Sequence, residues 1–200
     1  MTRNGWISAV LFLMSFVALD DQEGPRPTIP AQRAEDRRSC ELDSLPSDIR
    51  DLMKRDFASW RVQEPQLLSR HAAKTWNSKN LEACPGIAVG LFQNSVTPSF
   101  AVLLLHTDQA VTGYKFIVFS RTEGKPLYEA SEVEHSDDSA ASDHFISKVI
   151  LSDFFSEESK KKYNVQAPEG ILLVDSAEQE YEADLYFWSG GGWRHKPVDD

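Results

Sequence analysis

Residues 86–121 read GIAVGLFQNSVTPSFAVLLLHTDQAVTGYKFIVFSR and contain three short apolar runs, at 86–93, 100–106 and 114–121. The runs are rich in Val, Ile, Phe and Leu, and turn-forming residues separate them, which is the pattern of strands joined by turns. Connections this short favour antiparallel pairing, because parallel strands need longer crossovers. The segment therefore predicts an antiparallel meander.

More strands are expected after this meander. The pattern predicts strands at 127–134, 145–151, 170–174, 183–188 and 193–198, and a short surface helix at 156–163 with Glu–Lys pairs four residues apart. The last two strands flank the sequence SGGG at 189–192, which is typical of a hairpin turn.

Helices are expected before the meander. Apolar residues recur with helical spacing and predict a helix at 46–59 with one buried face, formed by Leu45, Ile49, Leu52, Met53, Phe57 and Trp60. Ser44 is the expected N-cap, and a second helix is expected at 65–76. Helices followed by strands indicate an α+β domain, with N-terminal helices packed on one face of an antiparallel β-sheet that is a meander with a C-terminal hairpin.

The first 39 residues differ in composition from the rest. Arg3 and Asn4 precede an apolar run at 6–19, which is typical of a secretory signal peptide and is shorter than the roughly 20 residues of a spanning helix. Phe16 is large for a cleavage site after Ala18, so an uncleaved N-terminal anchor is the alternative. Residues 20–39 are charged and Pro-rich, which predicts a flexible linker. One α+β domain is then expected at 40–200, in the periplasm or secreted.

The cysteines and the charge restrict the partners. Cys40 and Cys84 are the two cysteines, and an even pair in an oxidising compartment suggests a disulfide, with two separate thiols as the alternative. The net charge of −10 argues against nucleic acid and anionic membranes, because both need clustered Lys and Arg. The expected partner is an envelope or extracellular protein or ligand.

Residues 90–102, GLFQNSVTPSFAV, resemble the strand–loop–strand G-D-F-N-G-D-G-x-x-D-F-A-V of FG-GAP or VCBS-like repeats, whose loop carboxylates hold calcium. The residues that fit this scaffold are Gly90, Phe92, Pro98, Phe100, Ala101 and Val102. The acidic positions of the repeat are Leu91, Ser95 and Ser99 in this chain. The resemblance therefore implies the hairpin without the calcium site, because calcium needs hard oxygen ligands.

The C-terminal sequence YFWSGGGWRHKPVDD at 186–200 is similar to the ending of a group of uncharacterised secreted bacterial proteins. Those proteins also share a helix ending in Trp, a Cys-Pro-Gly before the first strand, and a similar hairpin. The counterparts in this chain are Trp60, the sequence at 84–86 and the run at 100–105. This resemblance implies a fold and a location, and the group has no function to carry over.

A polar stretch contains the densest group of metal-ligating residue types: His135, Asp137, Asp138, Asp143 and His144. Imidazole and carboxylate groups bind zinc and other divalent ions. The spacing matches no known ligand motif, so a solvated loop is the alternative. No cofactor is predicted.

Aromatic residues gather near the C-terminus. Strand alternation at 183–188 places Leu185 and Phe187 on one face and Tyr186 and Trp188 on the other, with Trp193 across the hairpin. Exposed Tyr and Trp are favoured interface anchors, which makes Tyr186, Trp188 and Trp193 candidate binding residues. The alternative is that a helix covers this face.

The sequence contains no known motif of nucleophilic catalysis, and no catalytic residue is assigned. There is no G-x-S-x-G elbow, and neither cysteine lies in a catalytic signature. Carboxylates are numerous, and a catalytic pair would form in space without a mark in the sequence. We therefore expect a non-catalytic binding or interaction protein. The alternatives are a hydrolase or metal-binding protein that uses the cluster at 135–144, and a purely structural role.

Overall fold

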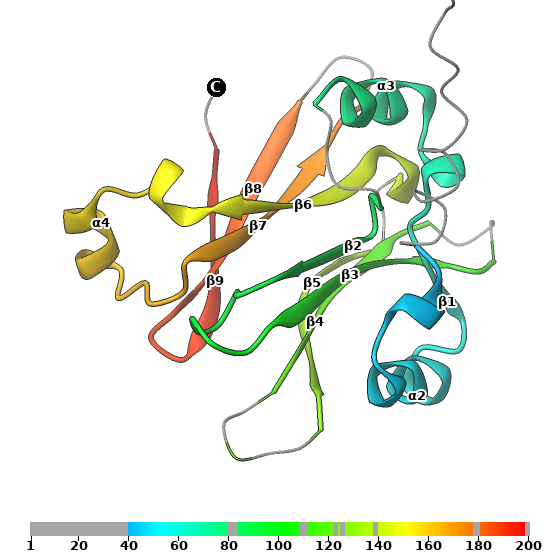
Figure 1. Cartoon of the computed structure of the whole chain (residues 1–200). Coiled ribbons are helices and arrows are strands. Elements are labelled where there is room, and N and C mark those ends of the chain that lie inside the picture. The colour runs from blue at the N-terminus through cyan, green and yellow to red at the C-terminus, as the bar shows by residue number, and fades with distance from the viewer. Residues whose placement is uncertain are drawn as a thin grey trace, which may run out of the picture.

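The computed structural model describes residues 40–79, 84–108, 112–121, 124, 127–137, 140–177 and 181–198. The predicted signal peptide at 1–19 and the predicted linker at 20–39 lie outside the described residues, and both stay predictions. The described chain forms two antiparallel sheets and three α-helices (Figure 1).

The first sheet contains the segment that predicts the meander. Its strands are β1 (Trp60–Val62), β2 (Ile87–Gly90), β3 (Ser99–His106), β4 (Tyr114–Ser120) and β5 (Glu129–Ser136). The order is β1-β3-β4-β5, and β2 also pairs with β3, beside β1. The antiparallel pairing predicted for residues 86–121 is therefore confirmed. Strand β1 was not predicted, because its three residues follow directly after a strong helical pattern.

The second sheet is formed by β6 (His144–Ile150), β7 (Glu169–Asp175), β8 (Glu182–Ser189) and β9 (Gly192–Pro197), paired in chain order. The predicted hairpin between β8 and β9 is confirmed, with Ser189 opposite Gly192. Gly190 and Gly191 have φ of 60° and 88°, as a two-residue turn with both central residues at positive φ requires.

The two sheets share one buried cluster. Leu103, Phe116 and Val118 of the first sheet pack in it with Ile171 and Tyr186 of the second sheet. In β3 the odd-numbered residues from 101 to 105 belong to this cluster, whereas Val102 and Leu104 point to the other face and are also buried. A strand that is apolar on both faces needs a layer on each side.

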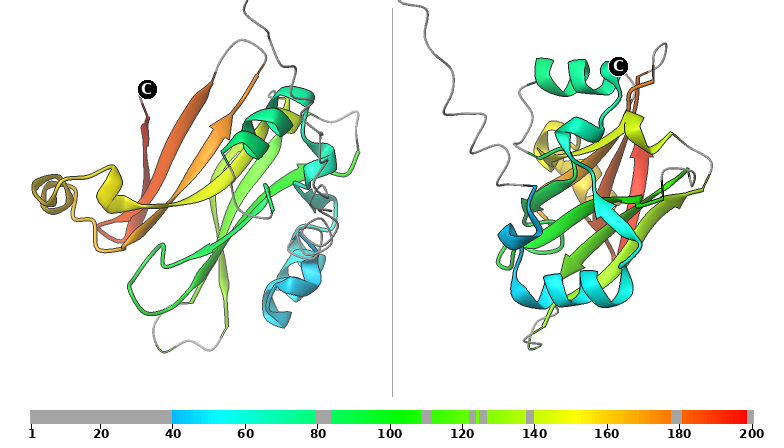
Figure 2. Two further views of the ribbon diagram at one scale, coloured as in Figure 1. Left: turned by 45° about the horizontal axis from the view of Figure 1, so that its top comes forward. Right: turned by 90° about the vertical axis from the view of Figure 1, so that its right-hand side faces the viewer.

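The helices contact different sheets. Ile49 and Met53 of α2 (Ser47–Asp56) share a buried cluster with Ile117 and Phe119 of the first sheet. Ala72 of α3 (Arg70–Ser78) clusters instead with residues of the second sheet, namely Phe145, Val174 and Ala183. Figure 2 shows α2 and α3 at these separate positions. The fold is α+β, as predicted, but strands predominate and form two sheets where one was expected.

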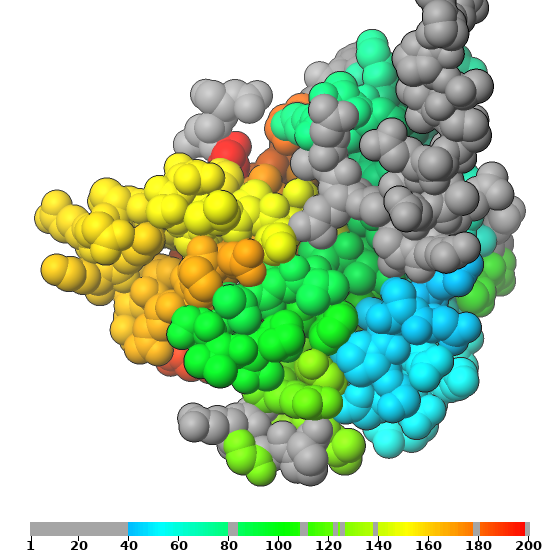
Figure 3. All heavy atoms as spheres, in the orientation of Figure 1, coloured from blue at the N-terminus to red at the C-terminus, as the bar shows by residue number. Residues whose placement is uncertain are grey.

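Short helical segments complete the chain. They are α4 (Glu157–Lys162) and the 3-10 turns η1 (Leu42–Ser44), η2 (Pro65–Leu67), η3 (Ala141–Asp143) and η4 (Leu151–Asp153). The N-cap predicted at Ser44 is wrong, because Ser44 ends η1 and its hydroxyl donates to the Glu41 carbonyl at 2.7 Å. Pro46 precedes α2 instead. In the space-filling view, the β2–β3 segment (green) lies between α2 (blue) and the segment from β6 to β7 (yellow to orange) (Figure 3).

Cys40 and Cys84 form a disulfide, as the favoured prediction stated, with 5.2 Å between their Cα atoms. Both cysteines are buried in the cluster beneath α2. The bond joins the start of the described chain to the residues just before β2, and it is compatible with an oxidising compartment. Within the described residues, no helix is both long enough and apolar enough to cross a membrane.

Candidate functional site

A row of polar side chains crosses one end of the second sheet. His144 begins β6 opposite Asp175 on β7, and Asp175 lies opposite Glu182 on β8. Two residues further along the strands the row is Ile146, Leu173 and Asp184. Side chains two residues apart in a strand share a face, so both rows point to the side that packs on the first sheet. The inner face is therefore apolar in the middle and acidic at this end.

The first sheet supplies the opposite wall. Tyr114 begins β4 opposite Ser136 on β5, and Phe116 lies opposite Glu134. The Tyr114 hydroxyl donates a hydrogen bond to Glu134 Oε1 at 3.0 Å. Tyr114 is buried, and its ring lies 4.5 Å from the His144 ring, centroid to centroid. This contact joins the two sheets at the polar end.

Between the two walls lies a cavity of about 380 Å³ that is open to solvent on one side, which we call the acidic pocket. Its lining comes from both sheets and consists of Tyr114, Glu134, His135, Ser136, His144, Leu173, Asp175, Glu182 and Asp184. Four of these side chains are carboxylates, and none of the described lining residues is Lys or Arg. The pocket therefore favours positive charge.

Asp175 carries an unsatisfied group in this pocket. Its Oδ2 lies 3.5 Å from His144 Nε2. Its Oδ1 is inaccessible to solvent and has no hydrogen-bond partner among the described residues. The Asp175 side chain as a whole is 42% exposed, so a cation in the pocket would meet the accessible part of this carboxylate and stabilise its charge.

His144 is held on all sides. Its Nδ1 lies 3.2 Å from the Ala140 carbonyl, and its Nε2 faces Asp175. Its backbone carbonyl accepts a hydrogen bond from Gln63 Nε2 at 2.8 Å. Each ring nitrogen of His144 therefore faces a hydrogen-bond acceptor. Neither nitrogen is directed at the Ser136 hydroxyl, which a general base would have to contact in order to activate it. The arrangement differs in this respect from a Ser-His-Asp triad.

The surroundings of Tyr114 keep its hydroxyl protonated. Burial raises the pKa of Tyr114 well above its ordinary value, and the negative charge of Glu134 raises this pKa further. Asp175 and Asp184 act on the pKa in the same direction. The phenol is therefore a neutral hydrogen-bond donor in the pocket and cannot serve as a base at neutral pH.

The structure separates the residues predicted to bind a metal. His135 and His144 both line the acidic pocket, but His135 pairs with Glu132 at 3.0 Å. Asp137 follows β5 in an exposed position, and Asp143 lies in η3. Asp138 lies outside the described residues. No group of three or more His, Cys, Asp or Glu within the described part of the chain could hold a metal ion. Metal binding by the five predicted residues as a set stays a prediction.

The aromatic residues of the hairpin have different surroundings. The predicted alternation is confirmed, because Leu185 and Phe187 pack in one buried cluster and Tyr186 packs in another. Tyr186 is only 2% exposed and contacts Phe116 edge to face, so the prediction that it faces solvent is wrong. The first sheet covers this face, where a helix was the alternative. Trp188 and Trp193 are half-buried and contact each other edge to face, with ring centroids 5.7 Å apart. Binding by these two residues stays a prediction.

Sequence reasoning did not single out Tyr114, Glu134, Asp175, Glu182 or Asp184. One signal was available for the acidic residues. Asp175 and Glu182 mark the end of β7 and the start of β8, so a hairpin places them opposite each other. The contribution of the first sheet could not be found this way, because it depends on which face of the first sheet packs against which face of the second.

Comparison of the chain with protein-family models, curated protein sequences and solved structures finds no match.

Proposed function

We propose that the protein is a binding protein whose acidic pocket holds a cationic group of its ligand, an ammonium or a guanidinium. The observation that supports this most directly is the lining, where four carboxylates surround one cavity and the described lining residues include no Lys or Arg. The Asp175 carboxylate, whose side chain is 42% exposed, is a charged acceptor for such a cation. Charge-assisted hydrogen bonds of this kind are about twice as strong as neutral ones.

The proposed location is the periplasm or the outside of the cell, and the proposed ligand comes from that compartment. Two observations support this location. The Cys40–Cys84 disulfide is stable in an oxidising compartment, and the apolar run at 6–19 is typical of a signal peptide. The proposed resemblance of residues 186–200 to secreted bacterial proteins agrees with the same location.

The test is a titration followed by NMR chemical shifts. The probes are n-butylammonium and methylguanidinium, with 1-butanol as the uncharged match of the first. We expect shifts at His144, Asp175 and Asp184 with the cations only, and binding that weakens as salt is added. Asp184→Asn should weaken binding about tenfold or more, because one charge-assisted contact is lost.

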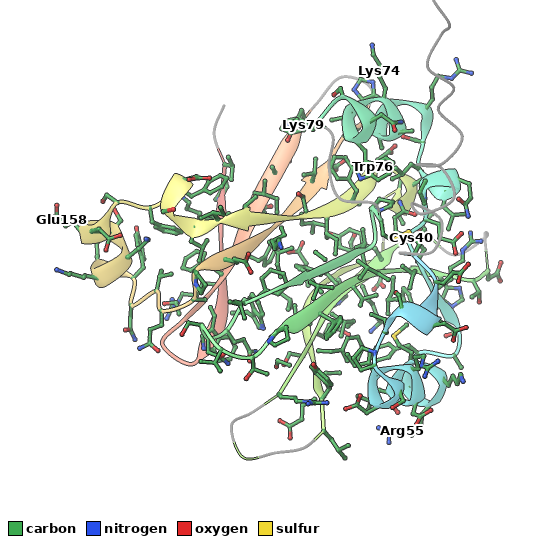
Figure 4. The ribbon with its side chains drawn as sticks, viewed as in Figure 1. Cys40, Arg55, Lys74, Trp76, Lys79 and Glu158 are labelled. Carbon is green, nitrogen blue, oxygen red and sulfur yellow. A yellow bond between two sulfur atoms is a disulfide. The ribbon has the colours of Figure 1, made fainter. Side chains whose placement is uncertain are left out.

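Glu158→Gln is the matched control variant, because it removes one negative charge on α4 (Figure 4). Glu158 does not line the acidic pocket. If Glu158→Gln weakens binding as much as Asp184→Asn does, the net charge of the protein would explain the binding without the acidic pocket. Shifts with 1-butanol equal to those with n-butylammonium, or no shifts with either cation, would refute the proposal.

The second candidate is a metal-binding protein or a hydrolase that uses His135 and His144. One observation favours it, since both histidines line the same pocket as the carboxylates. Calorimetric titration with Zn²⁺ separates the two candidates. Binding of Zn²⁺ that His144→Ala abolishes, without any binding of organic cations, would replace the first candidate by the second.

A further inference from the structure

We propose that the cation belongs to an extended peptide segment, which adds to β5 as a further strand and places a Lys or Arg side chain in the acidic pocket. This inference rests on the proposed function and names the class of ligand. Three features of the first sheet carry it: the position of β5, the reach of the pocket and the charges along the strand.

Strand β5 ends the first sheet. In the order β1-β3-β4-β5, its one partner among the described strands is β4. The outer edge of such a strand presents backbone N–H and C=O groups that an extended peptide can pair with. Strand addition of this kind supplies affinity through the main chain and leaves specificity to pockets for side chains.

The acidic pocket reaches this edge. Glu134, His135 and Ser136 are consecutive residues of β5, and all three line the pocket. The cavity therefore runs along the end of β5, the last strand of the sheet. A strand added to β5 would lie about 4.8 Å from it, within reach of a long Lys or Arg side chain. A side chain of an added strand could therefore enter it from the edge.

The charges of β5 select the kind of strand that can be added. Glu129, Glu132 and Glu134 lie on this strand, and Asp175, Glu182 and Asp184 lie across the pocket. Charged side chains protect an edge strand against unwanted pairing. Glu132 already pairs with Lys115 of β4 at 2.7 Å. Glu134 and the carboxylates across the pocket have one sign, so an acidic strand is repelled, including β5 of a second copy. A basic segment is attracted.

A second copy of the chain could offer its own basic edge strand, β9, with Arg194, His195 and Lys196. Two of these side chains already have partners within the chain. The His195 ring stacks on Tyr186 at 5.5 Å and its Nδ1 lies 3.6 Å from Asp184 Oδ1. Lys196 Nζ lies 4.6 Å from the centre of the Phe155 ring. A separate peptide that carries a free Lys or Arg therefore fits the observations better.

The experiment compares one peptide with its chemically matched forms. The probe is the capped peptide Ac-Thr-Val-Thr-Lys-Thr-Val-Thr-amide, and n-butylammonium represents the side chain alone. The same peptide with acetyl-lysine removes the charge. Two N-methylated forms block either set of alternate amides, only one of which can face β5. Calorimetry gives the affinities, and hydrogen exchange reports on the amides of β5.

We expect the lysine peptide to bind about tenfold or more tightly than n-butylammonium, because main-chain pairing adds to the contact of the cation. Acetylation of the lysine and Asp184→Asn should each weaken peptide binding. One N-methylated form should lose binding while the other retains it. Exchange of the β5 amides should slow with the peptide and not with n-butylammonium.

Other results overturn the inference in distinguishable ways. If n-butylammonium binds and the peptide binds no more tightly, strand addition is wrong while the proposed function stands. If neither probe binds, both are wrong. If neither acetylation of the lysine nor Asp184→Asn changes peptide binding, the peptide pairs with the edge of β5 but its side chain does not occupy the acidic pocket. Sedimentation that shows a dimer, dissociated by Arg194→Glu and competing with the peptide, would make a second copy the occupant.

Discussion

Tyr114 is the residue of the pocket whose ionisation the structure changes most clearly. Its folded-state pKa lies above the value of about 10 expected in the unfolded chain. The folded state therefore keeps a proton that the unfolded state releases. The stability gained from this difference is complete below about pH 10 and is lost as the pH rises further. Alkali should destabilise the fold partly through this residue.

Replacing Glu134 by Gln removes the charge that accepts the Tyr114 hydrogen bond. We expect the pKa of Tyr114 to fall towards its ordinary value in Glu134→Gln, as followed by phenolate absorbance with Tyr114→Phe as the reference that identifies the signal. The loss of unfolding free energy above about pH 10 should be shallower than in the wild type. A Tyr114 titration that is unchanged in Glu134→Gln would contradict this account.

Glu182 illustrates the cost of concentrating carboxylates. It lies directly opposite Asp175 across β7 and β8, and like charges in this position destabilise a sheet. We expect Glu182→Gln to raise the free energy of unfolding by about 0.2–1 kcal/mol in urea denaturation, with a larger gain at low salt. The same variant should bind n-butylammonium more weakly. Such opposite effects on stability and binding are typical of a functional site.

Glu158→Gln is again the matched control for this experiment, since it changes the net charge equally on α4. It should leave binding close to the wild type, and any change in stability should be a loss, because Glu158 lies in the first turn of α4. If Glu182→Gln instead lowers stability, Glu182 makes a favourable contact that outweighs its repulsion from Asp175. The pocket would then be better described as a structural network.

Two residues of the acidic pocket could be identified as candidates from the sequence, and the others could not. His135 and His144 attracted attention because imidazoles lie near carboxylates along the chain. The wrong prediction for Tyr186 has a physical cause. Strand alternation separates the two faces of β8 correctly, but it cannot say which face meets another layer. In this molecule the second layer is a sheet, and it buries Tyr186 against Phe116.

At the scale of elements, one junction connects three strands. Gln63 follows β1, and its N–H donates to the Leu103 carbonyl on β3 at 2.9 Å. Leu103 N–H in turn donates to the carbonyl of Gly86, just before β2, also at 2.9 Å. The Gln63 side chain is fully buried and reaches the start of β6 through the His144 carbonyl. The junction therefore links the edge of the first sheet to one wall of the acidic pocket.

Gly86 is the position where this junction leaves no room. A Cβ atom there would lie 2.3 Å from the Gln63 carbonyl oxygen and 2.8 Å from its nitrogen, and both are backbone atoms that cannot move aside cheaply. We expect Gly86→Ala to lower the free energy of unfolding by about 1–3 kcal/mol. Because Gln63 holds His144, binding of n-butylammonium should weaken as well.

The matched control for Gly86→Ala is Gly192→Ala, because a Cβ at Gly192 meets no atom within 4 Å. This variant should match the wild type in stability and in binding. Urea denaturation and the NMR titration measure both effects. Equal stabilities of the two variants would show that the junction adapts, and that the close approach at Gly86 does not constrain β6.

At the scale of the whole molecule, the prediction was most accurate where information is local. The helix face at 46–59, the meander and the glycine turn all follow from residues close in sequence, and each has its counterpart in the structure. The division into two sheets depends on contacts between distant segments. A strand that is apolar on both faces, such as β3, indicates that a second layer is present, because each face needs a layer to cover it. Such a strand does not indicate which strands belong to which sheet.

The disulfide constrains the molecule as a whole. It closes a loop of 44 residues that contains α2, β1 and α3 and ends just before the Gly86 junction. Closing such a loop in the unfolded chain stabilises the folded state by about 3–4 kcal/mol on the chain-entropy model. The replacement of both cysteines by serine should therefore move the urea midpoint down by the equivalent amount.

A single replacement sharpens this test, because either cysteine alone cannot form the bond. Cys40→Ser should lose nearly as much free energy of unfolding as the double variant, whereas two independent buried thiols would give losses that add. Reduction of the wild type under native conditions should reproduce the same midpoint shift. A double variant with an unchanged midpoint would show that the bond forms without constraining the fold. The stability of the domain would then rest on its buried clusters alone.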